Sequence, residues 1–218
     1  MGLWWNADGW ASFSHGSELG QIAQNLAEGR GFSSPFEKGS TPTALFSPAV
    51  PLLWGWLFGV TGIFSKISLG VVQVLQAGIG ALTCSVYFAL FVGLTEKDRL
   101  GNIWLYWAIG GFLVLWPDII FGDYLPWYFP WQNLALALTC YWAWVWWRDG
   151  SWKAAVWMGL CGGALGLINP VPLIFWGWVG LTRTLKGVGD RSIRIVGQGA
   201  LVGLMAVGLW SPWLIRNR

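Results

Sequence analysis

Residues 131–168 read WQNLALALTCYWAWVWWRDGSWKAAVWMGLCGGALGLI, which is two apolar runs joined by a short break. Each run approaches the length of about 20 residues that an α-helix needs to cross the hydrocarbon core of a bilayer. The break between them carries Arg148 and Lys153. Neither run alternates apolar with polar residues, so helices are expected here and membrane-spanning β-strands are not. The stretch therefore predicts two successive helical crossings of a membrane.

Similar runs fill most of the chain. Its 218 residues include 20 tryptophans, only 11% are charged, and the mean hydropathy is +0.52. So little polar material could not cover the surface of a soluble domain. We therefore expect an all-α, polytopic membrane protein with about six transmembrane helices and with juxtamembrane amphipathic or interfacial helices on its outer side. The expected crossings are Leu69–Leu94, Ile103–Trp116, Trp131–Trp147, Trp152–Ile168, Val171–Leu185 and Ile193–Leu214.

Basic residues are concentrated in alternate breaks between these runs. Breaks 95–100, 148–153 and 182–194 together hold eight Lys and Arg, whereas breaks 117–130 and 169–172 hold none. The positive-inside rule places the basic breaks in the cytoplasm and the other two outside. The net charge of +3 belongs largely to these cytoplasmic breaks, so no nucleic-acid partner is expected and the lipid bilayer is.

The chain divides into an outer segment, residues 1–68, and a transmembrane module, residues 69–218. Within the first, Ser17–Glu28 predicts a short helix, with Ser17 as its N-cap and Gly29 as its C-cap. One face of this helix is apolar, and a helix so short and two-faced is expected to lie on a membrane surface. The apolar face consists of Leu19, Ile22, Ala23 and Leu26.

Phe46–Phe64 is apolar enough to cross, but Pro48 and Pro51 interrupt its start. Counting it as a crossing would also put the basic breaks on opposite sides of the membrane. We therefore expect it to lie in the outer leaflet. A polar segment outside the membrane normally follows a helix or signal that carries it there, so we expect the chain to be a fragment of a larger protein.

The outer side carries few polar groups. Its candidate catalytic acids are Glu18, Asp8, Asp118 and Asp123, because a carboxylate can act as general base toward an acceptor hydroxyl or amine. Arginine can hold a leaving phosphate by paired hydrogen bonds. With one His and no Cys/His cluster, no zinc site is expected. The candidate substrate-binding residues are His15, Arg30, Lys38 and Arg216.

Four stretches resemble, in order, parts of the dolichyl-phosphate-mannose–protein mannosyltransferase family, the family-39 glycosyltransferases, and most closely its bacterial members related to the aminoarabinose transferases of lipid A. Residues 17–36, SELGQIAQNLAEGRGFSSPF, resemble the first periplasmic loop of that family. Residues 41–51, TPTALFSPAVP, resemble the entry to its juxtamembrane helix. Residues 167–170, LINP, resemble its Asn-Pro break, and residues 211–217, SPWLIRN, resemble the stretch that closes its membrane module.

The resemblance implies the glycosyltransferase C fold, a polyprenyl-phosphate sugar donor, an active site on the outer face of a bacterial inner membrane and an acceptor of unknown kind. It also implies that a first transmembrane helix and a C-terminal part are missing. Where the family usually carries a catalytic Asp before its Ile-Ala-x-Asn stretch, this chain has His15 and Gly16. Glu18 is the nearest carboxylate and our first choice as base, with Asp8 as the alternative.

The resemblance further implies that Asp118 or Asp123 positions the acceptor or a divalent cation, and that Arg216 binds the donor phosphate. We expect Glu18 to be partly desolvated beside the apolar stripe and to face a cavity shared with these residues. Two other functions stay open. A transporter subunit would carry charged or polar residues near helix midpoints, and runs such as Leu134–Trp147 and Trp152–Ile168 have none, which argues against it. An inactive scaffold would keep the fold without the chemistry.

Overall fold

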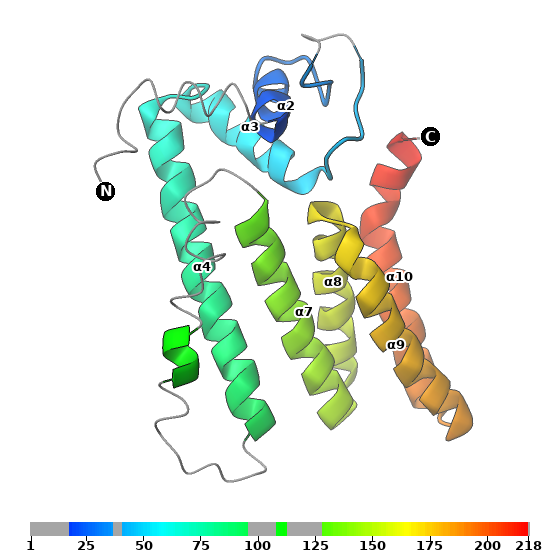
Figure 1. The fold of residues 1–218 in the computed structure, drawn as a ribbon. Coiled ribbons are helices and arrows are strands. Elements are labelled where there is room, and N and C mark those ends of the chain that lie inside the picture. The colour runs from blue at the N-terminus through cyan, green and yellow to red at the C-terminus, as the bar shows by residue number, and fades with distance from the viewer. Residues whose placement is uncertain (1–17, 37–40, 96–107, 113–127, 218) are drawn as a thin grey trace.

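The computed structural model describes residues 18–36, 41–95, 108–112 and 128–217. In this part of the chain all regular secondary structure is helical, which confirms the all-α prediction. Five long helices run side by side as a bundle, and two short helices, α2 and α3, lie across one end of it (Figure 1). The elements are α2 (Glu18–Ala27), α3 (Ala49–Thr61), α4 (Lys66–Thr95), α7 (Phe129–Asp149), α8 (Trp152–Ile168), α9 (Val171–Gly189) and α10 (Ile193–Arg216).

We call residues 18–36 and 41–61, which comprise α2, α3 and their connection, the cap. We call the opposite end of the bundle the basic end. Helices α7 to α10 alternate in direction between the two ends (Figure 1). Helix α4 ends at the basic end, whereas α7 begins beside the cap. The expected crossing Ile103–Trp116 falls between these two helices in the sequence and lies outside the described residues, except for 108–112, which are helical.

The apolar runs predict most of the helix bounds well. Helix α8 has the predicted bounds. Helix α7 is two residues longer than predicted at each end, and α10 is two residues longer at its C-terminal end. The break predicted at 182–194 begins later than expected, because α9 continues to Gly189 and includes Arg183 and Lys186. Two interactions explain the extension. Arg183 donates a hydrogen bond to the Trp147 carbonyl oxygen at 3.1 Å, and Lys186 lies in the last turn, where a cation stabilises the helix dipole.

The turn between α7 and α8 is specified by two residues. Gly150 adopts a left-handed conformation, with φ 60° and ψ 30°, and donates from its backbone N–H to the Trp146 carbonyl oxygen at 2.9 Å. Such a C-cap favours glycine because a Cβ is unfavourable there. The next residue, Ser151, is the N-cap of α8 and accepts a hydrogen bond from the Ala154 N–H at 3.1 Å. These caps explain why two long helices meet in so short a turn.

Glycines bring α8 and α10 into close contact. A Cβ placed on Gly159 would lie 3.0 Å from the Val202 carbonyl oxygen, and one on Gly163 would lie 3.2 Å from the Ala206 Cα. The two glycines are four residues apart and therefore share one face of α8. Small residues at this spacing allow helix backbones to approach closely, a common packing device among transmembrane helices.

Two of the described helices are long and apolar enough to cross a membrane, Lys66–Leu94 and Ile193–Arg216. All charged residues of the described segments lie within about two turns of an end of the bundle. Among the described residues, the basic end holds six Lys and Arg with two Asp, and the cap end holds three Lys and Arg with two Glu. The middle of the described bundle therefore carries no charge.

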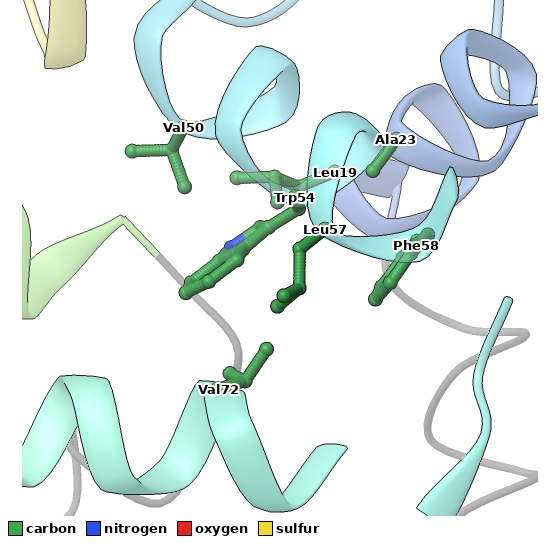
Figure 2. Close-up of a cluster of buried hydrophobic side chains, with 7 residues drawn as sticks. All are labelled: Leu19, Ala23, Val50, Trp54, Leu57, Phe58 and Val72. Carbon is green, nitrogen blue, oxygen red and sulfur yellow. The ribbon is translucent and has the colours of Figure 1, made fainter. Parts of the chain in front are cut away.

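The cap has its own apolar core (Figure 2). Leu19 and Ala23 of α2 pack against α3 around Trp54, whose side chain is 1% exposed, and Val72 of α4 closes the cluster from below. The apolar stripe of α2 therefore meets protein and not lipid, because it faces α3, while the expected position of α2 at a membrane surface stays a prediction. The close contact depends on Gly55, since a Cβ there would lie 2.6 Å from the Leu26 Cβ.

Candidate functional site

The loop that follows α2 is held in place by the helix itself. Gly29 has φ +77° and ends α2. The Gly29 N–H donates to the Leu26 carbonyl oxygen at 3.1 Å, and the Arg30 N–H donates to the Asn25 carbonyl oxygen at 2.8 Å. This is the Schellman pattern, and it confirms Gly29 as the predicted C-cap. The predicted N-cap, Ser17, lies outside the described residues.

Asn25 joins α2 to this loop. Its side chain is 4% exposed, and its amide nitrogen donates to the Ser34 carbonyl oxygen at 3.0 Å. Its side-chain oxygen accepts two hydrogen bonds from Arg30, at 3.0 and 2.6 Å. Arg30 also forms an ion pair with Glu28. The guanidinium of Arg30, a candidate for substrate binding, is therefore committed to the local structure of the loop.

Arg216, at the end of α10, reaches across to the same loop. It donates to the Phe32 carbonyl oxygen at 2.9 Å and to the Thr43 carbonyl oxygen at 3.0 Å. Its guanidinium carbon also lies 5.1 Å from the centre of the Phe32 ring and 4.8 Å from that of Trp213, distances typical of cation–π contacts. Arg216 therefore fixes the loop of the cap to the end of the bundle.

The loop meets the end of α10 through aromatic contacts as well. The rings of Phe32 and Trp213 are 5.0 Å apart in an edge-to-face arrangement, a geometry that aromatic pairs favour. Within the loop, the Thr43 N–H bonds to the Phe32 carbonyl oxygen at 3.2 Å. The backbone around Phe32 is therefore held from both sides.

A second polar contact lies where α7 and α8 reach the cap. The Asn169 amide donates to the Gln132 side-chain oxygen at 2.7 Å, and the Asn169 side-chain oxygen accepts from the Val171 N–H at 3.1 Å. Beside it, the rings of Trp54 and Trp131 lie 5.8 Å apart. Both indole N–H groups are buried without a hydrogen-bond partner in the described structure. Such donors are available to an oxygen atom of a ligand or water.

Glu18 is the first residue of α2, and its side chain is exposed. The expectation of a partly desolvated carboxylate is therefore wrong, because the stripe beside Glu18 turns toward α3 and leaves position 18 at the rim. Its carboxylate has no hydrogen bond or ion pair with any residue that the structure describes. An exposed carboxylate is able to accept a proton from a bound hydroxyl.

The other candidates cannot be placed. Asp8, His15, Lys38, Asp118 and Asp123 lie outside the described residues, so the cavity that we expect Glu18 and Arg216 to share with an outer-loop aspartate stays a prediction. No group of three metal-ligating residues occurs within the described segments.

Sequence reasoning did not single out the polar residues that connect the helices. Gln198 is 0% exposed, accepts a hydrogen bond from the Trp146 indole at 2.9 Å and donates to the Gly150 carbonyl oxygen at 2.7 Å. The only signal of such a residue is an isolated amide within an apolar run. That signal identifies Gln198 as a polar residue within an apolar helix, but it does not predict the hydrogen bonds to Trp146 and Gly150.

Comparisons of the chain with family models, with curated proteins and with solved structures find no match.

Proposed function

We propose that the chain is a module of a membrane glycosyltransferase of the glycosyltransferase C type. In this proposal it transfers a sugar from a polyprenyl-phosphate donor to an acceptor on the outer face of a bacterial inner membrane. The observation that carries the proposal is the meeting, at one end of the bundle, of the four stretches that resemble the mannosyltransferase family.

The contacts between these stretches are direct. Arg216, in the stretch 211–217, donates hydrogen bonds to the carbonyl oxygens of Phe32 and Thr43. These two residues belong to the stretches 17–36 and 41–51. Ile168, in the stretch 167–170, packs against the apolar cluster formed by the cap. Stretches that are distant in sequence but build one surface are typical of a site assembled on a scaffold.

Charge and apolar exposure support the membrane location and its orientation. The surplus of Lys and Arg at the basic end favours a cytoplasmic position for that end, which puts the cap outside. Helix α9 exposes a row of large apolar side chains, a surface that favours contact with lipid. The row includes Ile174, Trp178, Leu181 and Leu185, which are 81%, 65%, 46% and 58% exposed.

In the proposed reaction Glu18 takes the proton from the acceptor hydroxyl. The acceptor oxygen then attacks the anomeric carbon of the sugar, the bond from that carbon to the phosphate oxygen breaks, and polyprenyl phosphate leaves. Arg216 is a positioning residue in this account, because its guanidinium already holds the loop through Phe32 and Thr43. The proposal keeps Asp118 or Asp123 as the acid that orients the acceptor or a divalent cation, and Asp8 as the alternative base.

The test is transfer of a radiolabelled sugar from a polyprenyl-phosphate donor by the protein reconstituted in lipid vesicles. Glu18→Gln is expected to slow transfer by about 10²–10⁴-fold, the usual contribution of a general base. Asp190→Asn, which removes an exposed carboxylate at the basic end, is the matched control and is expected to leave transfer unchanged. Equal rates for Glu18→Gln and the unaltered chain would remove Glu18 as the base.

An inactive scaffold is the second candidate. It is favoured by the commitment of both described arginines at the cap end to internal partners. Arg30 bonds to Asn25 and pairs with Glu28, and Arg216 bonds to the loop. A scaffold would bind neither donor nor acceptor. Absence of polyprenyl-phosphate binding to the reconstituted chain, measured by donor partition into protein-containing nanodiscs, would favour it over the transferase.

A further inference from the structure

Helix α10 contains a proline, Pro212, one turn before its end. Proline has no backbone N–H, so the Gly208 carbonyl oxygen, four residues earlier, cannot accept the usual helical hydrogen bond. The Ser211 hydroxyl donates to this oxygen instead, at 2.9 Å. A proline and a hydroxyl bonded in this way both bend a helix, and the end of α10 leans away from the line of the helix below it (Figure 1). Helix α10 therefore consists of two parts, joined at Ser211–Pro212.

The longer part, residues 193–210, is fixed to the bundle. Its backbone lies close to α8, with Val202 opposite Gly159 and Ala206 opposite Gly163. Deeper in the bundle, the buried Gln198 accepts a hydrogen bond from the indole of α7 residue Trp146 at 2.9 Å. Because backbones this close cannot slide or tilt without opening the interface, this part of α10 belongs to the bundle.

The last turn, residues 212–216, is fixed to the cap. Arg216 donates to the Phe32 carbonyl oxygen at 2.9 Å, and the rings of Phe32 and Trp213 lie 5.0 Å apart. The side chains of Leu214 and Ile215 are 40% and 69% exposed, so part of the turn's surface is open. The contacts of α10 therefore change partner at the bend, from the bundle to the cap.

The junction between the cap and the bundle buries polar groups without satisfying them. The rings of Trp54 in the cap and Trp131 in α7 lie 5.8 Å apart, and both indole N–H groups are buried without a hydrogen-bond partner in the described structure. A buried donor without an acceptor destabilises the state that buries it. A movement of the cap away from α7 would open both groups to water or to an oxygen atom of a ligand.

We propose that the cap and the last turn of α10 move as one body against the bundle, with Ser211–Pro212 as the hinge. Hinges are a few residues that absorb the change in backbone angles between two rigid parts. In the closed arrangement the last turn ties the cap to the bundle. Opening widens the junction beside Trp54 and Trp131 and gives a lipid-borne ligand a route between the cap and the bundle. The inference goes beyond the proposed function, since neither a sugar donor nor the transfer reaction enters it.

The test is double electron–electron resonance on the full chain in lipid nanodiscs, with its three cysteines replaced by alanine and nitroxide labels on pairs of introduced cysteines. The label positions Thr41, Val74, Leu204 and Ile215 are all exposed. The pair Val74–Ile215 joins α4 to the last turn across the hinge and is expected to show two distances. The pair Val74–Leu204 joins α4 to α10 below the hinge, and the pair Thr41–Ile215 lies within the moving body. Each of these two pairs is expected to show one distance.

Three variants connect the movement to the bend. Pro212→Ala restores a backbone N–H for the Gly208 carbonyl oxygen and is expected to leave the pair across the hinge with one distance. Ser211→Ala removes the bond that stabilises the closed bend and is expected to raise the share of the second distance. Ser85→Ala is the matched control, because it removes a similar bond from a hydroxyl to the Ala81 carbonyl oxygen, at 2.9 Å, in a helix segment without proline. It is expected to have no effect.

Three results would overturn the proposal. The first is a single Val74–Ile215 distance in the unaltered chain, and the second is a pair of distances that persists in Pro212→Ala. The third is an equal spread of distances for Thr41–Ile215 and Val74–Ile215, because the cap and the last turn would then not move together. None of these results bears on the transferase proposal, which is tested by transfer of sugar.

Discussion

Arg216 is the residue on which the connection between the cap and the bundle depends most. It lies at the end of α10, yet two of its hydrogen bonds go to the carbonyl oxygens of Phe32 and Thr43, far away in sequence. A hydrogen bond from a charged donor contributes more than one between neutral groups. We infer that the geometry of the loop depends on this guanidinium.

Replacement of Arg216 tests this dependence. Arg216→Ala is expected to lower the free energy of unfolding of the cap by about 1–2 kcal/mol, because the two hydrogen bonds to the loop and the contacts with Phe32 and Trp213 are lost. Arg216→Lys keeps the charge but not the forked geometry and is expected to recover only part of the loss. Hydrogen exchange of the amides in residues 30–34 measures the effect. Arg191→Ala, at the basic end, is the control, and equal exchange in Arg216→Ala and the unaltered chain would contradict the account.

At the residue scale, the sequence predicts which polar side chains lie on one side of the membrane better than it predicts their hydrogen-bond partners. Composition singles out Glu18, Arg30 and Arg216 as polar groups on one side of the membrane, and the structure places all three at the cap end. It does not predict that both arginines are held by carbonyl or amide oxygens, because those contacts depend on how distant segments meet. The exposure of Glu18 was missed for a similar reason, since it follows from the position of α3.

At the scale of the elements, the contact between α8 and α10 is set by glycine. Gly159 and Gly163 face α10, whereas a Cβ on the neighbouring Gly162 would meet no atom within 4 Å. The three glycines share one helix and a buried setting. They therefore provide a matched comparison of close packing against open space.

We expect Gly159→Ala to destabilise the bundle by about 1–3 kcal/mol, the usual cost of an added methyl group in a tightly packed interface. The added Cβ would lie 3.0 Å from the Val202 carbonyl oxygen, and the backbone there cannot move aside as a side chain can. Gly162→Ala is expected to leave stability unchanged or to raise it by up to about 1 kcal/mol through helix propensity. Unfolding in mixed detergent micelles gives both values. An equal loss of stability in Gly159→Ala and Gly162→Ala would contradict this account, because it would show that the stability loss does not come from the contact between α8 and α10.

Helix bounds were predictable where an apolar run ends at a clear signal. Trp152–Ile168 is such a case, because Ser151 caps its start and Asn169-Pro170 ends it. The end of α9 was not predictable from polarity. Arg183 and Lys186 resemble a polar break in the sequence, but Arg183 bonds to the Trp147 carbonyl oxygen and Lys186 lies in the last turn of the helix. The partner of α2 was also missed, because its amphipathic pattern fits a membrane surface and a protein surface equally well.

At the scale of the whole molecule, the division of charge between two ends links sequence to orientation. The alternation of basic breaks predicts which turns share a side, and the described turns follow it: those at 149–152 and 189–193 lie at one end, and 168–171 lies at the other with the cap (Figure 1). Two helices meet the length and apolarity of a membrane span. The count of six crossings stays a prediction.

The central claim is that the cap lies outside the membrane and the basic end in the cytoplasm. Single cysteines at Thr41 and Asn217 report on the first, and single cysteines at Asp149 and Asp190 on the second, in a chain whose Cys84, Cys140 and Cys161 are replaced by alanine; all four label positions are exposed. A membrane-impermeant maleimide applied to spheroplasts of a bacterial host is expected to label positions 41 and 217, and to label positions 149 and 190 only after the membrane is opened. Labelling of positions 149 and 190 in intact spheroplasts, with positions 41 and 217 protected, would contradict the account.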